Sequence, residues 1–473
     1  MNRKLTIIAL GFFITTCSLD AKVKLATIFS DNMVLQQQSK NKIWGQANAN
    51  TTIYLTASWD NKKHSAKSDS KGYFSIEIIT PDAGGPYTME ISDGEKLNLN
   101  NILIGEVWLC SGQSNMEMPL KGFRGQPIAN SQCKIIGASP TQNLRLFTVK
   151  RAYNTSPQSD VEGLWSQSVP QTAREFSATA YYFGDLLQKT LNVPLGLIHS
   201  SWSASKIEAW MSKETLSHFS EIDMSVLKNT EFEYPASTPS VLYNAMINPL
   251  TGLSIRGVIW YQGESNSANP KQYKKMFAAW AEQWRTNFNN PQMPIYYTEI
   301  APFQSSDKNA INLAIFREAQ LESMNELQNV GMAATTDLGH QYFIHPPFKQ
   351  QVGERLAYWA LSKTYKIEGI SYMGPSYKSL KLLEDNSIEV VFKHGEEGLI
   401  PENEDVVGFE IAGADGEFKP AKATIINGSS RVKVWNDEIY QPKEVRYCFR
   451  NYTEGNLYNN FGIPAIAFRA SIK

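Results

Sequence analysis

Cysteine is scarce in this sequence, with four residues in a chain of 473. Loss of an N-terminal leader would remove Cys17 and leave Cys110, Cys133 and Cys448. Three cysteines cannot form a full disulfide framework, so at most one bridge is possible. Cys110 lies in an apolar run and is interpreted as a buried thiol. No spacing of cysteine and histidine resembles a metal site, so the sequence predicts no metal cofactor.

The sequence also lacks an excess of charge of one sign, since its formal net charge is −1. A chain without a basic footprint is not expected to bind nucleic acid, and a neutral or polar substrate fits it better than a polyanion. Beyond the N-terminus, no apolar run reaches the roughly 18 residues that a membrane-spanning helix needs. The composition therefore indicates a folded protein without a membrane span.

The N-terminus has the pattern of a signal peptide over residues 1–21. Positive charge at 2–4 precedes an apolar stretch at 5–15, and Ala21 offers a small residue for cleavage. Lipid attachment at Cys17 is the weaker alternative, because the residues before it match a lipid-attachment box poorly. We therefore expect the mature protein to be periplasmic or secreted.

The length of the chain predicts two or three domains. Residues 22–100 and 366–473 contain short strand-like segments separated by turn residues, which predicts an N-terminal β domain and a C-terminal β-sandwich-like module. Residues 101–365 differ, because apolar runs alternate there with helical periodicity. Strands are expected at 102–109, 144–149, 195–199, 257–261, 294–300 and 330–336, and helices at 178–190, 273–288, 311–326 and 349–361. This alternation predicts an α/β domain in which helices cover both faces of an open parallel sheet.

The first of these strands leads directly into a candidate nucleophile. The apolar run 102–109 reads as a strand buried on both faces, and small turn-forming residues follow it at 111–115. Such a strand-turn-helix lifts Ser114 to the edge of the sheet, close to free backbone N–H groups. A serine in that position can act as a nucleophile, and the N–H groups can stabilise an oxyanion.

Other polar residues follow the remaining strands, and ligands of open parallel sheets bind at the carboxyl ends of the strands. The residues in question are Ser203 after the third strand, Gln262 and Asn266 after the fourth, and Asp337, His340 and His345 after the sixth. A serine, amides, a carboxylate and histidines at one edge are the inventory of a Ser/His hydrolase with an oxyanion hole.

Three motifs carry a family resemblance: residues 112–116 (GQSNM), residues 260–266 (WYQGESN) and His345-Pro346. Together they resemble the SGNH-hydrolase superfamily and, within it, the sialate O-acetylesterase family. Further segments of the mature chain share the likeness, at 29–37, 241–247, 316–320 and 454–458. The resemblance implies an SGNH-hydrolase (flavodoxin-like) parallel sheet flanked by helices.

The resemblance also implies an activity, the removal of acetyl groups from sugar hydroxyls, with 9-O-acetyl sialic acid as the expected substrate. Ser114 would be the nucleophile, and His345 would be its general base. The Ser114 backbone N–H and the Gln262 side chain would hold the oxyanion, with Asn266 as a further donor. The reaction would pass through an acetyl-serine and would need no metal or organic cofactor.

The chain departs from the family pattern before the histidine, where the family usually carries an aspartate. Here those positions hold Tyr342 and Phe343. Asp337, on the same segment, could act as the third member of a triad. Otherwise a backbone carbonyl orients His345, and the enzyme works with a Ser/His dyad at a lower rate.

A second departure lies at Ser203 and Ala204, where the family tends to carry two glycines. Their backbone N–H groups can still reach an oxyanion if the backbone angles suit residues with a Cβ. Trp202 beside them is a candidate for lining a sugar site, whereas Trp210 is expected to pack in the core.

Two alternatives stay open from the sequence alone. The same chemistry could act on acetylated xylan or another acetylated polysaccharide, which exposed aromatic residues along a groove would favour. A non-catalytic glycan-binding protein on the same scaffold is the other alternative, supported by the absent aspartate. His340 is the rival general base to His345. The oligomeric state leaves no signal in the sequence.

Overall fold

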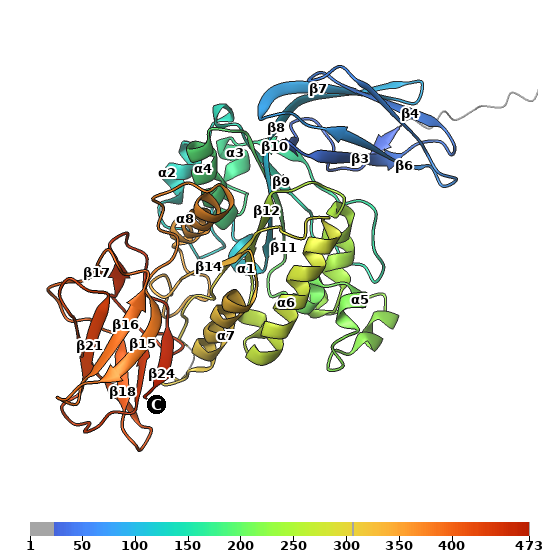
Figure 1. Ribbon diagram of the computed structural model, residues 1–473. Helices are drawn as coiled ribbons and strands as arrows, with labels where there is room; N and C mark the ends of the chain where they lie inside the picture. Colours follow the sequence, from blue (N-terminus) through green and yellow to red (C-terminus); the bar gives the residue numbers. More distant parts are fainter. Residues whose placement is uncertain (1–22, 305–306, 473) are drawn as a thin grey trace, which may run out of the picture.

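The computed structural model describes residues 23–304 and 307–472. The signal peptide expected at 1–21 lies outside these described residues. A helix-flanked central body lies between two β-rich modules, with the N-terminal module in blue and the C-terminal module in orange and red (Figure 1). The predicted α/β class with two β-rich modules is thereby confirmed.

The central sheet is mixed, and its core is parallel. Across the sheet the strands follow the order β10-β9-β11-β8-β12-β13-β14. Their bounds are β8 (Lys96–Gly112), β9 (Leu144–Thr148), β10 (Trp165–Gln167), β11 (Leu195–Ser201), β12 (Gly257–Tyr261), β13 (Ile295–Thr298) and β14 (Val330–Ala333). Only β10 at the edge of this series is antiparallel to its neighbour. All six strands expected from the apolar runs are therefore present in the sheet.

Strand β8 lies at the switch point of this sheet. After β8 the chain first builds β9 and β11 on one side, and then β12, β13 and β14 on the other. Loops that leave neighbouring strands in opposite directions open a crevice at such a point, where ligands of doubly wound sheets bind. Ser114 follows β8 directly, so the fold places it at this switch point.

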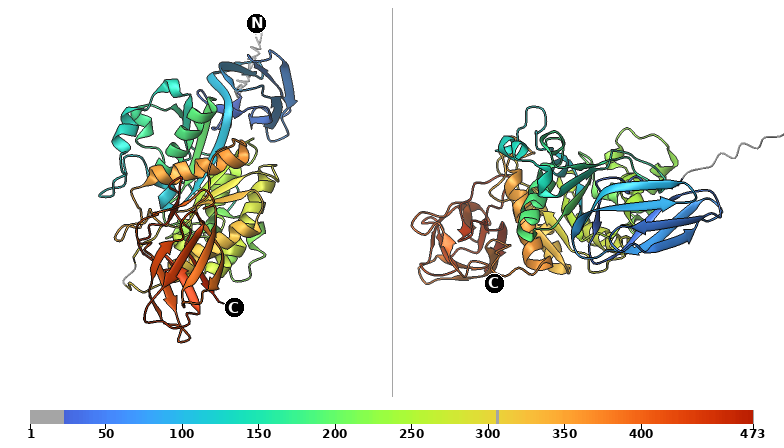
Figure 2. Two further views of the ribbon diagram at one scale, coloured as in Figure 1. Left: turned by 60° about the vertical axis from the view of Figure 1, so that its left-hand side comes forward. Right: turned by 90° about the horizontal axis from the view of Figure 1, so that it is seen from above.

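Helices cover both faces of the central sheet (Figures 1 and 2). Their bounds are α1 (Ser114–Glu117), α2 (Ser131–Ile136), α3 (Pro170–Ala173), α4 (Ala178–Leu191), α5 (Lys213–Leu216), α6 (Pro270–Asn287), α7 (Asn312–Glu326) and α8 (Lys349–Trp359). Helices α4 and α8 pack together on one face, and α6 and α7 pack together on the other. In α6, the residues Met276, Trp280 and Trp284 recur at helical spacing and are fully buried, which explains why this segment docks as a helix.

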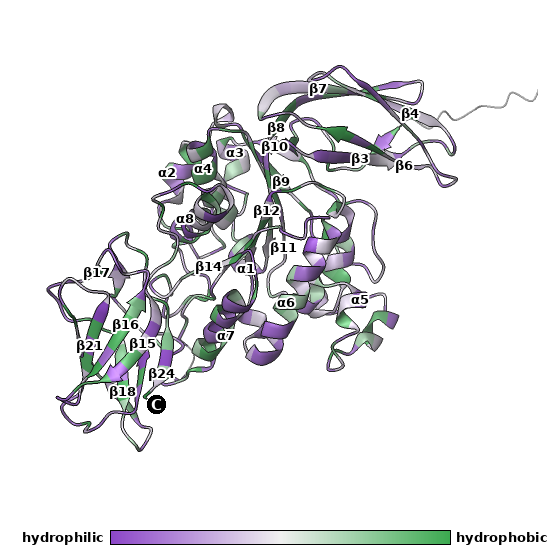
Figure 3. Ribbon diagram, viewed as in Figure 1, coloured by the Kyte–Doolittle hydropathy of each residue, from purple (hydrophilic) through white to green (hydrophobic). Residues whose placement is uncertain are grey.

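The hydrophobic core follows the same layers (Figure 3). Trp108 on β8 and Trp260 on β12 are completely buried between the sheet and its helices. Ring contacts extend from Trp260 to Trp280 and Trp284 of α6, with the nearest centroids 4.4 Å apart. Much of the aromatic content of the chain is thus used for packing.

The N-terminal module is continuous with the central sheet, because β8 runs through both. Its other strands are β1 (Lys24–Leu25), β2 (Val34–Gln36), β3 (Lys40–Gln46), β4 (Thr52–Ala57), β5 (Lys63–Lys67), β6 (Tyr73–Ile79) and β7 (Gly84–Ser92). The first part of β8 pairs with β7 and β2, and its last part pairs with β11 and β12. The domain boundary expected at residue 100 therefore falls inside one strand.

The C-terminal module contains two four-stranded antiparallel sheets, β15-β16-β21-β20 and β19-β18-β22-β24, around a core of their own. Its strands are β15 (Ser376–Leu382), β16 (Ile388–Lys393), β17 (Leu399–Ile400), β18 (Phe409–Ala412), β19 (Phe418–Pro420), β20 (Lys422–Ile425), β21 (Arg431–Trp435), β22 (Glu444–Tyr447), β23 (Tyr458–Asn459) and β24 (Phe468–Ser471). Buried Arg317 of α7 fastens this module to the central body, since its guanidinium donates to the carbonyl oxygens of Cys448 and Arg450 at 3.4 and 2.6 Å.

The sequence predicts a buried thiol at Cys110 and no membrane-spanning helix. Cys110 and Cys448 are buried free thiols, and Cys133 is an exposed free thiol. Within 23–304 and 307–472, no helix is long and apolar enough to cross a membrane.

Candidate active site

Ser114 is the first residue of α1, immediately beyond the end of β8. The turn requires Gly112, whose φ is +144° and whose Cβ, if present, would lie 2.1 Å from the Tyr261 carbonyl oxygen. In the described chain, the backbone N–H of Ser114 has no acceptor. Ser114 is largely buried, since only 6% of the residue is exposed.

His345 contacts the Ser114 hydroxyl directly. Its Nε2 lies 2.8 Å from Ser114 Oγ, and its Nδ1 lies 2.7 Å from Oε1 of Gln126. An amide oxygen only accepts hydrogen bonds, so Nδ1 carries the proton and Nε2 presents a lone pair to the serine. That is the tautomer a general base needs.

A tight turn holds His345 from two sides. Gln126 N donates to Phe123 O at 2.9 Å, and Gly125 between them has a φ of +75°. The Phe123 ring meets the His345 imidazole edge to face with centroids 5.4 Å apart. The turn at 123–126 therefore supplies both a hydrogen bond and a packing wall for the imidazole.

The environment of His345 favours the neutral imidazole. Burial and the neighbouring Lys349 charge lower the pKa of His345 to about 4. Gln126 adds no negative charge to oppose this shift. At neutral pH the histidine is therefore free to accept a proton.

Behind Ser114 lies a buried network centred on Asn115. Its Nδ2 donates to Glu264 Oε1 at 2.6 Å and to the Ile344 carbonyl at 3.1 Å, and its Oδ1 accepts from Lys349 Nζ at 2.5 Å. One side chain thus connects the helix of Ser114 to the residue before His345. The network fixes Ser114 and His345 relative to each other.

Both charged members of this network are shifted by their surroundings. Burial lowers the pKa of Lys349 to about 7, although the nearby Glu264 carboxylate opposes the shift. Burial likewise raises the pKa of Glu264, whose Oε2 has no partner among the described residues. Glu264 therefore serves this network as a buried acceptor for the Asn115 amide.

Asp337 forms its hydrogen bonds with Arg355 and not with His345. Its two carboxylate oxygens accept from Nη1 and Nη2 of Arg355, each at 2.7 Å. A bidentate pair of this kind holds the carboxylate in one orientation. The structure therefore gives Asp337 a partner in α8, and the position beside Nδ1 belongs to Gln126.

Gln262 and Asn266 bond to each other and to the neighbouring loop, instead of to Ser114. Gln262 Nε2 donates to Ser205 O at 3.0 Å and to Asn266 Oδ1 at 2.7 Å, which uses both amide hydrogens. Asn266 Nδ2 in turn donates to Glu208 at 2.8 Å. Their side chains brace the edge of the sheet, and both amide hydrogens of Gln262, expected from the sequence at an oxyanion, are engaged in these contacts.

Ser203 is also engaged, through its neighbour Glu117. The Glu117 carboxylate accepts from the Ser203 backbone N–H at 2.8 Å and from the Ser203 hydroxyl, and it pairs with Arg151. Ala204 is different, since its backbone N–H has no acceptor within the described part of the chain. Its φ of +58° is the left-handed conformation that glycine adopts more easily, at a cost of about 1 kcal/mol for alanine.

The chain matches a known family over the region that builds this site. The family model of carbohydrate esterases described as sialic acid-specific acetylesterases matches residues 104–362, more than half of the chain. The chain belongs to this family. Its members are carboxylic-ester hydrolases, and O-deacetylation of sugars is the activity that goes with the fold.

Individual relatives agree with the family assignment. The sialate O-acetylesterase of Mus musculus is 26% identical over 425 residues, covering 77% of this chain and 78% of its own. The human sialate O-acetylesterase is 29% identical over 399 residues, covering 76% of this chain and 74% of its own. A solved structure, a carbohydrate acetylesterase from Xanthomonas citri, superposes with a TM-score of 0.85 and 32% identity, over 95% of this chain and 99% of the other.

Trp202, Trp210 and His340, together with His199 of β11, have the following places in the structure. Trp210 is fully buried, as expected, and His199 is buried with a pKa lowered to about 4 by desolvation. Trp202 lies at the edge of the sheet, where the Arg151 guanidinium stacks 5.4 Å from its ring. His340 contacts the ring of Phe343, and its Nδ1 accepts from the Tyr342 N–H, so His345 is the histidine placed at the serine.

Sequence reasoning missed Gln126 and Lys349. Gln126 lies 219 residues from His345, and a glutamine in a turn carries no local signal of such a contact. Lys349 did leave a signal. It shares a helical face with Val352 and Leu356, at spacings of three and seven, and a lysine on an apolar face indicates a buried amine that needs a partner.

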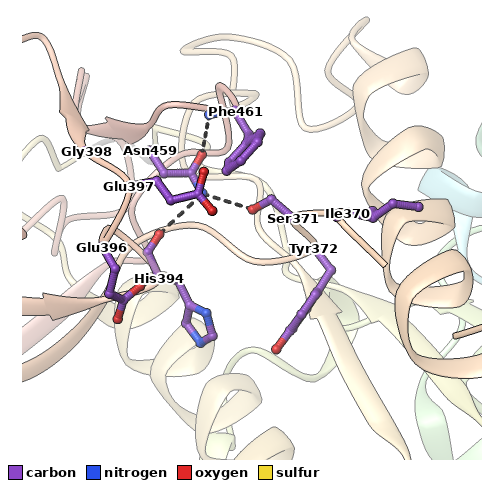
Figure 4. A pocket seen from close by; sticks show the side chains of 10 residues that line it. Ile370, Ser371, Tyr372, His394, Glu396, Glu397, Gly398, Asn459 and Phe461 are labelled. Carbon is purple, nitrogen blue, oxygen red and sulfur yellow. Dashed lines mark hydrogen bonds between the residues drawn. The ribbon is translucent and has the colours of Figure 1, made fainter. Parts of the chain in front are cut away.

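A separate hollow of about 240 Å³ lies where the central body meets the C-terminal module (Figure 4). Asn459 crosses it, with Nδ2 donating to Ser371 Oγ at 3.3 Å and to His394 O at 3.4 Å. Tyr372 on its wall packs against Trp359 of α8 with centroids 4.6 Å apart. These contacts join the two parts of the chain, and neither Ser114 nor His345 lines this hollow.

Proposed function

We propose that the protein is a serine esterase that removes O-acetyl groups from sugars through an acetyl-Ser114 intermediate, with 9-O-acetyl sialic acid as the expected substrate. One observation carries the proposal: the hydrogen-bonded series from Ser114 Oγ to His345 Nε2 and from His345 Nδ1 to Gln126 Oε1, at 2.8 and 2.7 Å. A serine linked in this way to an oriented, neutral imidazole is an activated nucleophile.

In the first step, Ser114 Oγ attacks the acetyl carbonyl carbon while its proton passes to His345 Nε2. The resulting imidazolium keeps its Nδ1–H bond to Gln126. Collapse of the tetrahedral intermediate breaks the ester C–O bond, and the proton moves from Nε2 to the departing sugar oxygen. Ser114 is left acetylated and His345 neutral.

The oxyanion of this step needs donors that are free before the substrate arrives. We assign the role to the backbone N–H groups of Ser114 and Ala204, neither of which has an acceptor among the described residues. Gln262 and Ser203, which the sequence suggested for the oxyanion hole, are not assigned this role. Their N–H groups already donate to other residues of the chain.

In the second step, water takes the place of the sugar. His345 accepts a proton from the water as its oxygen attacks the acetyl carbonyl, and the proton then returns to Ser114 Oγ as acetate leaves. The same donors hold the second oxyanion. Ser114 and His345 thereby recover their starting state.

Acetate release tests the proposal. The substrates are 9-O-acetylated sialic acid, acetylated xylan and a small aryl acetate, assayed with the wild type and with Ser114→Ala. Release from sialic acid that is lost in Ser114→Ala is the expected result. Folded wild type that releases acetate from none of the three, and that a serine-directed organophosphate does not label, would be a non-catalytic glycan-binding protein.

Acetylated xylan or another acetylated polysaccharide is the second candidate substrate. The observation that favours it is the exposure of Tyr342 and Phe343 directly before His345, where a polymer chain could lie. Acetate release from xylan alone would support the same mechanism with a polysaccharide as the substrate.

We also propose that this esterase acts in the periplasm or outside the cell. The support is the charged, apolar and small-residue pattern at 1–21. Fractionation of cells that express the full chain, with N-terminal sequencing of the mature protein, tests it. A cytoplasmic protein that keeps its first residues would refute the localisation without affecting the chemistry.

A further inference from the structure

Three consecutive large apolar side chains reach solvent immediately before His345. Tyr342 is 73% exposed, Phe343 is 40% exposed and Ile344 is 41% exposed. Single exposed apolar residues are ordinary on a protein surface, whereas a contiguous set beside a catalytic residue indicates a binding surface. Tyr342 and Phe343 of this set occupy the positions where the family usually carries its aspartate.

The two aromatic rings are held in place by His340. The Phe343 ring lies 4.6 Å from the His340 ring, and the Tyr342 ring lies 6.2 Å from it, centroid to centroid. His340 Nδ1 also accepts from the Tyr342 N–H at 3.1 Å. The His340 N–H in turn donates to Pro302 O at 3.1 Å, which ties the bend to the segment after β13. Rings ordered in advance lose little entropy when they bind a ligand.

The proposed reaction determines where the sugar lies. The departing sugar oxygen takes its proton from His345 Nε2, so the sugar must leave along the His345 side of the site. The surface next to His345 on its own segment is the run 342–344. Residues 341–344 carry no charge, and the faces of a pyranose ring are rows of C–H groups that pack on aromatic rings.

We propose that Tyr342 and Phe343 form a stacking platform for a neutral pyranose ring of the acetylated glycan. The inference rests on the proposed function with its second candidate substrate, acetylated xylan or another acetylated polysaccharide, and specifies that substrate on its leaving-group side. Gln126 then orients His345 in place of the family aspartate. The positions of that aspartate, Tyr342 and Phe343, bind sugar instead. Stacking remote from the breaking bond stabilises ground and transition states alike, so its loss raises KM and leaves kcat nearly constant.

The test compares Tyr342→Ala, Phe343→Ala and Tyr342→Phe with the wild type. Acetylated xylan oligosaccharides report on the platform, and a small aryl acetate reports on the chemistry alone. Tyr440→Ala is the matched control, because Tyr440 is also a highly exposed tyrosine, at 77%. It precedes β22 in the C-terminal module, and the opposite end of β22 is the one that leads to the contact with Arg317 of the central body. The readout is the ratio of kcat/KM for the oligosaccharide to kcat/KM for the aryl acetate.

We expect each alanine variant to lower this ratio about two- to tenfold through KM, the range that one aromatic contact supplies. Tyr342→Phe keeps the ring and should keep the ratio, as should Tyr440→Ala. A ratio unchanged in both alanine variants, or an equal loss in Tyr440→Ala, would overturn the platform.

A binding assay separates failure of the platform from failure of the proposed function. Deacetylated xylan oligosaccharides are titrated into Ser114→Ala alone and into Ser114→Ala combined with Tyr342→Ala. Binding that weakens with the second substitution supports the platform even if the wild type releases no acetate from any sugar. No binding to Ser114→Ala, or equal binding to both proteins, refutes it whatever the esterase assay gives.

Discussion

The side-chain oxygen of Gln126 lies 2.7 Å from Nδ1 of His345, although 219 residues separate the two along the chain. Ser/His hydrolases commonly place a carboxylate at this point. An amide oxygen fixes the same tautomer and the same ring orientation, but it lends no negative charge to the imidazolium that forms during the reaction. His345 is therefore oriented by a partner that carries no charge.

Replacement of Gln126 by alanine should lower kcat. The hydrogen bond from Nδ1 becomes charge-assisted when the imidazolium forms and is then worth about 1.5–3 kcal/mol, which corresponds to roughly a 10- to 150-fold loss. Initial rates on the aryl acetate measure it. Gln171→Ala, on the exposed surface of α3, is the control that should retain activity. Full activity in Gln126→Ala would show that His345 is held by its packing alone.

The pH dependence of kcat/KM should report the pKa of His345. Protonated His345 cannot accept the serine proton, so kcat/KM of the wild type should fall only as the pH drops through about 4. In Gln126→Glu a carboxylate replaces the amide and stabilises the imidazolium, so the acid limb should move to higher pH. An acid limb that is unmoved in Gln126→Glu would contradict the contact between residues 126 and 345.

Asp337→Asn should affect stability more than catalysis. The substitution breaks the two-pronged ion pair with Arg355 and leaves a largely buried guanidinium with a weaker partner, which should lower the free energy of unfolding by about 1–3 kcal/mol. Urea unfolding measures that loss, and kcat on the aryl acetate should stay within a few-fold of the wild type. A large loss of kcat in a stably folded Asp337→Asn would instead make this aspartate the third catalytic member.

Lys349→Met should lower stability and raise the pKa of His345 together. The amine is fully buried and bonds Asn115 Oδ1, so its loss leaves a buried acceptor unpaired, at about 1–3 kcal/mol. The acid limb of kcat/KM should move to higher pH, because the Lys349 charge helps to hold the His345 pKa down. Lys271→Met, on the exposed side of α6, serves as the control. Loss of stability without movement of the limb would confine Lys349 to a structural role.

The combination Lys349→Met with Glu264→Gln extends the same test. Removal of the amine alone leaves the buried Glu264 carboxylate without a cation, whereas the paired substitution removes both charges. The double variant should recover part of the free energy of unfolding. A double variant whose loss of stability equals the sum of the losses in Lys349→Met and Glu264→Gln would show that the two charges do not interact.

The sequence by itself determined the local elements and pointed to Ser114 and His345 as the candidate reacting residues. Apolar runs and helical periodicity are properties of neighbouring residues, so they predicted the strands of the central sheet and helices such as α6. The motif around Ser114 and the histidine at 345 could likewise be recognised, because each depends on a few adjacent positions.

Only the tertiary structure decided which side chains serve those two residues. Asp337 was expected at His345, but Arg355 of α8 binds its carboxylate, and Gln126 from a distant turn takes the position instead. Gln262 was expected at the oxyanion, but its amide hydrogens are used by Ser205 and Asn266. Hydrogen bonds are formed between groups that the fold brings within about 3 Å, and a linear sequence does not encode that distance locally.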